Sequence, residues 1–219
     1  MGDAKGTLLM TDIEIRPLDA SLAEAAFDLA SRNFATQSAL HVALDARLDD
    51  YRAYLRPTFF DDVNDGLSLA ATQAGTGDLV GVLIVRDFRK QRFAGHLPFQ
   101  QLYDPVTALF ETLEADYLQD RHLKTGEALL VDMAAGVPSH TGLGIYQTLR
   151  REISSRARSA GYKYIIGELT TAATQHVVVA KLGHRTCATI VPSDFVHAGR
   201  RPFASVTDPP TILLTEETL

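Results

Sequence analysis

The sequence predicts an α/β fold, because a buried strand, a glycine loop, an amphipathic helix and a second buried strand follow one another directly. The first strand, at 128–134, is an apolar run interrupted by a single aspartate, and the second lies at 164–169. A helix that crosses over in the usual right-handed sense makes two such strands parallel neighbours. An upstream hairpin adds antiparallel strands, so we expect a mixed sheet.

The composition fits one domain and argues against several classes of protein. A chain of 219 residues, 46% of them hydrophobic, is long enough for one full core. We therefore expect residues 1–12 to be a flexible leader and residues 13–219 to form a single domain. The net charge of −6 argues against a general nucleic-acid binder, since such a protein needs a basic face.

Cysteine content and hydropathy set the expected surroundings of the protein. Cys187 is the only cysteine, which excludes an intramolecular disulfide and a cysteine-built metal site, and we expect no metal. The sequence has no apolar run long enough to cross a bilayer and no secretory signal at its start. We therefore expect a cytoplasmic protein without a membrane partner.

The N-terminal half predicts three strands. Residues 13–17 alternate in polarity and end at a proline, as an outer strand does. Residues 67–73 and 79–85 form a hairpin around a glycine-containing turn. The basic run at 86–95 holds two phenylalanines and has a nucleic-acid patch as one interpretation, but the acidic whole favours a solvated loop.

Three helices are predicted in the same half. A capping-box pattern at 21–24, beginning with serine and ending with glutamate, opens the first. The second has apolar residues repeating over 40–55 and is expected to stop at Pro57. The third is expected to begin with Asp104 as its cap and Pro105 as its first residue.

The glycine loop and its helix form the strongest local signal. Gly142 and Gly144 can adopt backbone angles closed to other residues, and the free amides of a helix N-terminus favour an anion such as phosphate. A glycine turn without any ligand is the alternative. Along the helix, Arg150 and Arg151 lie off the apolar stripe, so we expect them on a solvated face, with phosphate contact as the alternative.

The C-terminal part is harder to interpret. Residues 172–182 contain three consecutive valines, which favour a strand, and end in Lys-Leu-Gly, which favours a helix C-terminus. A strand is expected at 186–192. The apolar residues at 211–215 are expected to add a last edge strand.

Three segments together resemble the core of the GCN5-related N-acetyltransferases: VDMAAGVPSHTGLGIYQTL, AGYKYIIGELT and AKLGHRT. Pro138, Gly142, Gly144, Lys181 and Gly183 stand at positions of the family's pattern. Upstream, DGLSLAATQAGTGDLVGVLIVRD resembles the second and third strands of the arylalkylamine N-acetyltransferase branch. The resemblance covers roughly residues 13 to 190 in order, and it favours a helix for 172–182.

The resemblance implies a fold and an activity. The fold is a central, mostly antiparallel twisted sheet of about six or seven strands with about four or five flanking helices and a parallel strand pair at the acyl-CoA cleft. The activity is transfer of an acetyl group from acetyl-CoA to a small primary amine by direct attack in a ternary complex. Two alternatives stay open: a longer or carrier-bound acyl donor, and a member without turnover that binds acyl-CoA as a sensor. Many relatives pair as homodimers.

The resemblance also implies a donor site. The strand edge at Ala134, Ala135 and Gly136 would pair with pantetheine, and the backbone amides of the following loop would hold the pyrophosphate. These loop residues are His140, Thr141, Gly142, Leu143, Gly144, Ile145 and Tyr146. Two of them depart from the pattern, since Thr141 replaces Arg or Gln and Tyr146 replaces Gly or Ala.

Three residues are candidates for proton transfer. Asp132 is a carboxylate within an apolar strand, alternating to the face opposite Val131 and Met133, and is either the general base or the partner of a buried arginine or backbone group. Glu168 is the second candidate base, with a rim position as its alternative. His176 is the candidate acid, because the family's tyrosine is absent, and a surface histidine is its alternative. Tyr146 is another candidate acid, and a thiolate that needs no protein acid is the remaining alternative.

Overall fold

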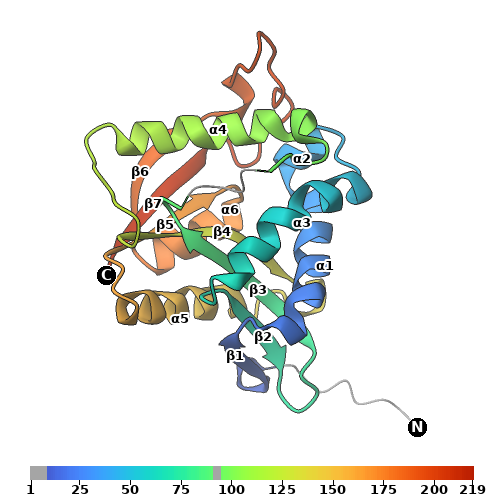
Figure 1. The fold of residues 1–219 in the computed structure, drawn as a ribbon, viewed down its shortest axis with the longest axis vertical. Helices are drawn as coiled ribbons and strands as arrows, with labels where there is room; N and C mark the ends of the chain where they lie inside the picture. Colours follow the sequence, from blue (N-terminus) through green and yellow to red (C-terminus); the bar gives the residue numbers. More distant parts are fainter. Residues whose placement is uncertain (1–8, 91–94) are drawn as a thin grey trace.

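A seven-stranded sheet runs through the protein in the computed structural model, which describes residues 9–90 and 95–219 (Figure 1). The strand order is β1-β2-β3-β4-β5-β7-β6, and only the β4–β5 pair is parallel. The strands are β1 Ile13–Pro17, β2 Leu69–Gln73, β3 Leu79–Asp87, β4 Ala128–Gly136, β5 Tyr164–Leu169, β6 Arg185–Ile190 and β7 Ile212–Thr218. The mixed, mostly antiparallel sheet with one parallel pair is therefore confirmed.

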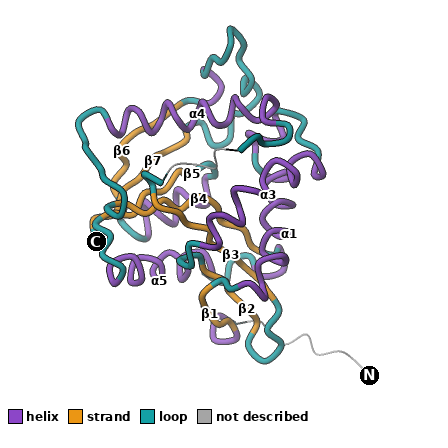
Figure 2. The backbone as a smooth tube through the Cα atoms, in the orientation of Figure 1, coloured by secondary structure: helices purple, strands orange, loops and turns teal. Residues whose placement is uncertain are grey.

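Helices cover both faces of the sheet. The described residues form α1 Ala20–Gln37, α2 Ala39–Ala43, α3 Leu48–Asn64, α4 Gln100–Leu118, α5 Ile145–Ser159 and the short α6 Ala172–Gln175. A π-helical turn, His176–Lys181, continues α6, so the helical interpretation of 172–182 is confirmed. Figure 1 shows α4 and α5 on opposite sides of the strands, and Figure 2 shows the long connection between β6 and β7 reaching past α4. None of the helices described is long and apolar enough to span a membrane.

Alternating side chains of the central strands build the core on the two faces. Leu129 of β4 packs with Leu149 and Ile153 of α5 on one face. The adjacent Leu130 packs on the other face with the residues of α4, among them Leu109. Residues 128–131 of β4 are four successive apolar residues and are buried on both faces of the sheet.

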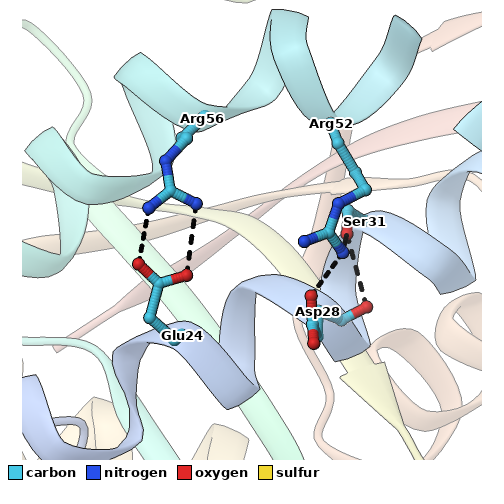
Figure 3. Close-up of polar contacts among 5 residues, drawn as sticks. All are labelled: Glu24, Asp28, Ser31, Arg52 and Arg56. Carbon is cyan, nitrogen blue, oxygen red and sulfur yellow. Dashed lines mark hydrogen bonds and ion pairs between the residues drawn. The ribbon is translucent and has the colours of Figure 1, made fainter. Parts of the chain in front are cut away.

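The long helices α1 and α3 are fastened to each other by two arginines of α3 (Figure 3). Arg56 makes a bidentate contact with Glu24 of α1, at 3.1 and 2.5 Å, and Arg52 pairs with Asp28. Both guanidinium groups also lie over the ring of Phe27, at 4.8 Å for Arg52 and 5.2 Å for Arg56. The contact sets the position of α3 over the sheet, and α3 forms one wall of the cavity described below.

The starts of two helices differ from the sequence-based prediction. The cap of α1 is Asp19, whose carboxylate accepts the Ser21 amide at 2.9 Å. Glu24 cannot complete the predicted capping box because it pairs with Arg56. Helix α4 begins at Gln100, ahead of Pro105, because the fully buried Tyr103 packs against the cluster under α1 and α3. Because Pro105 has no amide N–H, the helix loses one backbone hydrogen bond, the one to a carbonyl of its first turn.

The second predicted helix is also different. It is interrupted between α2 and α3, and α3 continues through Pro57 to Asn64. Phe59 and Val63 follow the proline on the buried face, so their packing holds the helix together across the lost hydrogen bond. The tail strand β7 is not at an edge, because it pairs with both β5 and β6.

Phe27 is expected to contribute far more to stability than the ion pairs around it. The ring is 1% exposed and meets Phe59 edge-on at 5.4 Å. Phe27→Ala should lower the free energy of unfolding by about 3–5 kcal/mol in urea denaturation. Glu24→Gln, at an exposed pair, should leave it nearly unchanged. Equal losses in the two variants would contradict this account of the α1–α3 contact.

Candidate active site

Strands β4 and β5 separate from each other halfway along their length. They pair from Ala128 with Tyr164 to Val131 with Gly167, and beyond that point β4 pairs with β3 alone. The edge of residues 132–136 that faces away from β3 is therefore open. Backbone amides and carbonyls on an open strand edge are available to an extended ligand with amide groups of its own.

A β-bulge at Asp132 changes the direction of the side chains at this separation. Ile84 pairs with Met133 and Val85 with Val131, so Asp132 has no partner in the register. As a result Val131 packs with the α5 side of the core and Met133 with the α1 side. The expectation that Val131 and Met133 share one face is therefore wrong, because the extra residue breaks the alternation.

One cavity of about 1100 Å³ occupies the space between the separated strands and the helices above them. Its walls come from the open end of β4, the glycine loop, the end of β5, and residues of α3 and α4. Asp132, Glu168 and His176 all line it, although they come from three different elements. The predicted donor residues line it as well, except Leu143: they are Ala134, Ala135, Gly136, His140, Thr141, Gly142, Gly144, Ile145 and Tyr146.

The glycine loop adopts the conformation that its glycines allow. Gly142 has φ of +86° and Gly144, the cap of α5, has φ of +82°. Within the described part of the chain, the backbone amides of Gly142 and of residues 144–147 donate to no protein acceptor. Those of His140, Thr141 and Leu143 are already used in turns. Fewer of the predicted loop amides are therefore free, and the amide of Gln147, which was not predicted, is free as well.

The two departures from the family pattern lie at the loop. Thr141 is exposed, and Tyr146 is half-buried in the first turn of α5. His140 is held by Gln73, at 3.2 Å between Nε2 and Oε1, which ties the loop to β2. The carbonyl of Gly136 on the open strand accepts the Asn33 amide at 3.1 Å.

The other part of the cavity is acidic and is organised by Arg86. This arginine of β3 is 6% exposed, and its Nε lies 3.3 Å from Asp132 Oδ1. Its Nη2 lies 3.9 Å from Glu114 of α4. The pairing of Asp132 with a buried arginine is thus confirmed, while its role as a base is untested. Arg86 itself was expected in a solvated loop, and residues 91–94 of that run lie outside the described residues.

Asp62 is a site residue that the sequence did not reveal. It lies on α3, is 7% exposed and lines the same cavity. Burial, and then the negative charge of Asp132, raise the pKa of Asp62 to about 8. Burial and Asp132 also raise the pKa of Tyr51, the fully enclosed phenol nearby. Because its pKa is about 8, Asp62 holds its proton at neutral pH.

The remaining candidates differ in their surroundings. Glu168 is half-buried near the end of β5, and His176 is exposed at the start of the π-helical turn. The surface interpretation of His176 agrees with this exposure. No group of three or more potential metal ligands of the His, Cys, Asp and Glu types occurs among residues 9–90 and 95–219.

Arg150 is not on a solvated face, contrary to the prediction. It is completely buried and lines the cavity, whereas Arg151 is exposed. Gly167 of β5 leaves room for it, because a methyl group at that position would stand 3.0 Å from Arg150 Nη1. The pattern of apolar residues along α5 does not reveal this space, because the space is provided by Gly167 of a different element.

Replacing Asp62 should change how stability depends on pH. Because its folded pKa of about 8 lies above the ordinary value of 3.8, the folded protein holds an extra proton between these values. Stability therefore falls as pH rises from about 4 to 8, by at most about 1.4 kcal/mol per pH unit from this group. Asp62→Asn should remove that slope in urea unfolding at several pH values. The exposed Asp49→Asn on the same helix should keep it, and an unchanged slope in Asp62→Asn would refute the assignment.

Comparison with known proteins identifies the fold. No protein-family model matches the chain, and no curated protein matches it in sequence. Among solved structures, the C-terminal condensation domain of Ebony in complex with β-alanyl-dopamine superposes with a TM-score of 0.83 and 17% identity, over 94% of this chain and 99% of that one. A putative arylalkylamine N-acetyltransferase 7 from the yellow fever mosquito superposes with a TM-score of 0.75 and 18% identity, over 94% of this chain and 87% of that one.

A third structure extends the comparison to a bacterial protein. The putative acetyltransferase yncA of Salmonella typhimurium, solved with its cofactor acetyl-CoA, gives a TM-score of 0.52 at 17% identity, over 95% of this chain and 94% of that one. All three matches span nearly the whole described sheet and its helices. The chain therefore has the fold of the GCN5-related N-acetyltransferases, as its strand, glycine loop and helix predicted.

Proposed function

We propose that this protein is an acyl-CoA-dependent N-acyltransferase that transfers an acetyl group from acetyl-CoA to a small primary amine. The observation that carries the proposal is the cavity of about 1100 Å³, which joins free amides at the N-terminus of α5 to the buried Asp62 and the half-buried Asp132. Phosphate groups suit the first end and a protonated amine suits the second. The open edge of residues 132–136 connects the two.

The reaction requires the amine to lose its charge before it attacks. An alkylammonium gives one proton to Asp132, which acts as the base. Asp62 stays protonated beside it and adds no second negative charge. The neutral nitrogen then attacks the thioester carbonyl carbon. A C–N bond forms, the C–S bond breaks with its electrons on sulfur, and the second nitrogen proton balances the thiolate. Glu168 and His176 line the same cavity and stay candidates for accepting or donating that proton.

Aromatic side chains suggest the class of amine. Phe34, His41, Tyr51 and Tyr54 line the cavity on the side of α1 to α3. Tyr51 meets His41 edge-on at 4.6 Å, which makes a rigid wall. An amine with an aromatic or apolar body fits next to this wall while its nitrogen meets the carboxyl pair. The names of two structural neighbours, an arylalkylamine N-acetyltransferase and a domain bound to β-alanyl-dopamine, support such an acceptor.

A longer or carrier-bound acyl donor is the second candidate, favoured by Thr141 and Tyr146. These residues alter the side-chain lining of the loop, where a coenzyme's phosphates would lie. The neighbour bound to β-alanyl-dopamine contains an aminoacyl amide, which is larger than an acetyl amide. A cytoplasmic location, a homodimer and the lack of nucleic-acid or membrane partners stay predictions.

One assay separates these possibilities. Purified protein is incubated with acetyl-CoA, a longer acyl-CoA or an acetylated phosphopantetheine, each with a panel of arylalkylamines and polyamines. Thiol release and the acylated product are measured together, the product by mass spectrometry. Product from acetyl-CoA supports the proposal, and product only from the other donors supports the second candidate. Coenzyme binding without any product would leave a sensor and overturn both.

Asp132→Asn should lower kcat/KM by on the order of 10² to 10⁴, because a positioned base contributes that much to proton transfer. Coenzyme A affinity, measured by calorimetry, should stay as in the wild type. Asp49→Asn, exposed on α3, is the matched control and should keep full activity. A rate and pH profile unchanged in Asp132→Asn would show that Asp132 is not the base.

Gly144→Val should weaken coenzyme A binding at least about tenfold, because a β-branched residue resists the φ of +82° and displaces the amides of residues 144–147. Gly161→Val is the matched control, since Gly161 has φ of +89° beyond the other end of α5 and open space around it. It should carry a similar conformational strain and bind coenzyme A normally in calorimetric titration. Normal binding in Gly144→Val would count against the loop as the phosphate site.

A further inference from the structure

Arg150 is a completely buried charge. Within the part of the chain that the structure describes, its Nε and Nη1 have no hydrogen-bond partner. Among the described residues no carboxylate forms an ion pair with it. Burying a guanidinium in this way costs several kcal/mol, and proteins normally offset that cost with an anion.

The neighbours of the guanidinium hold it in place but add no compensating charge. Nη2 donates to Nδ1 of His184 at 3.4 Å, and His184 in turn faces Glu217, with 3.3 Å between Nε2 and the carboxylate. Burial, and then Arg150, lower the pKa of His184 to about 4, so this histidine is neutral at physiological pH. The neutral ring of His184 therefore separates Glu217 from the guanidinium of Arg150. Glu217 also accepts a hydrogen bond from the Ser154 hydroxyl.

The charge sits at the point where the sheet opens. Gly167 is the last residue of β5 that pairs with β4, and its missing side chain leaves the space for Arg150 Nη1. Asp132, the first residue of the open edge, follows Val131, the partner of Gly167. Arg150 and Asp132 both line the cavity of about 1100 Å³. A donor that lies along residues 132–136, with its phosphates on the loop, brings its thioester to this opening.

We propose that Arg150 stabilises the negative charge that forms on the donor sulfur when the C–S bond breaks. The inference rests on the proposed function. The electron pair of the broken bond stays on sulfur, and the permanent positive charge of the guanidinium lowers the energy of that thiolate through the low-dielectric space between them. Arg150 thus stabilises the thiolate by its charge, where a general acid would do so by protonation. The thiolate takes its proton from the acylated nitrogen.

The test is the pKa of the thiol of bound coenzyme A, followed by the ultraviolet absorbance of its thiolate. In the wild type this pKa should lie about one to two units below that of free coenzyme A. Arg150→Met should abolish the shift, and Arg150→Lys should retain most of it. Arg158→Met, exposed on the same helix, should not change it.

Two further measurements keep the result interpretable. Thermal unfolding of Arg150→Met should show no loss of stability, since an unpaired buried charge is replaced by an apolar chain of similar length. Gly167→Ala, which displaces the guanidinium but keeps the charge, should reduce the thiol shift in part. A normal thiol pKa in the wild-type complex, or the same shift in Arg150→Met, would overturn the inference and leave the proposed function intact. Absence of coenzyme A binding in the wild type would overturn both.

Discussion

The separation of β4 from β5 is the constraint on which the site depends. Parallel strands normally stay paired because unpaired backbone groups are costly when buried. Here pairing ends at Val131 and Gly167, and the bulge at Asp132 begins directly afterwards. The open edge exists because the chain continues into the glycine loop and α5, which returns across the sheet to pair β5 in parallel. A closed sheet at this point would have no cavity.

The cavity has a positive region and a region lined by carboxyl groups. Free amides at α5 and the buried Arg150 make the first region positive, while Asp132, paired with Arg86, and the protonated Asp62 provide carboxyl groups in the second. The two regions suit an anionic donor and a cationic acceptor. Burial keeps Asp62 in its protonated, uncharged form, and no carboxylate among the described residues pairs with Arg150. The free-energy cost of burying Asp62 and Arg150 is offset by packing in other parts of the fold. These are the aromatic contact of α1 with α3 and the core on each face of the sheet.

Local patterns in the sequence predict the strand, loop and helix well because each depends on neighbouring residues. The left-handed glycines and the apolar stripe of α5 are of this kind. Features that depend on distant segments were missed or misplaced. The pKa of Asp62 is raised by burial and then by Asp132, which lies on a strand far along the chain, and the space for Arg150 comes from Gly167. Pro57 and Pro105 lie inside helices because buried aromatic residues beside them pack on other elements. The interior place of β7 likewise depends on strands other than its own.

The most direct test of the account is a crystal structure of the protein with coenzyme A and an unreactive amine analogue. The account predicts the diphosphate on the amides at the start of α5, pantetheine along residues 132–136 and the sulfur between Asp132 and Gly167. The amine analogue should lie against Asp62 and Asp132. Coenzyme A bound away from the opening between β4 and β5, or an amine remote from the carboxyl pair, would contradict the central claim that this opening is the reaction site.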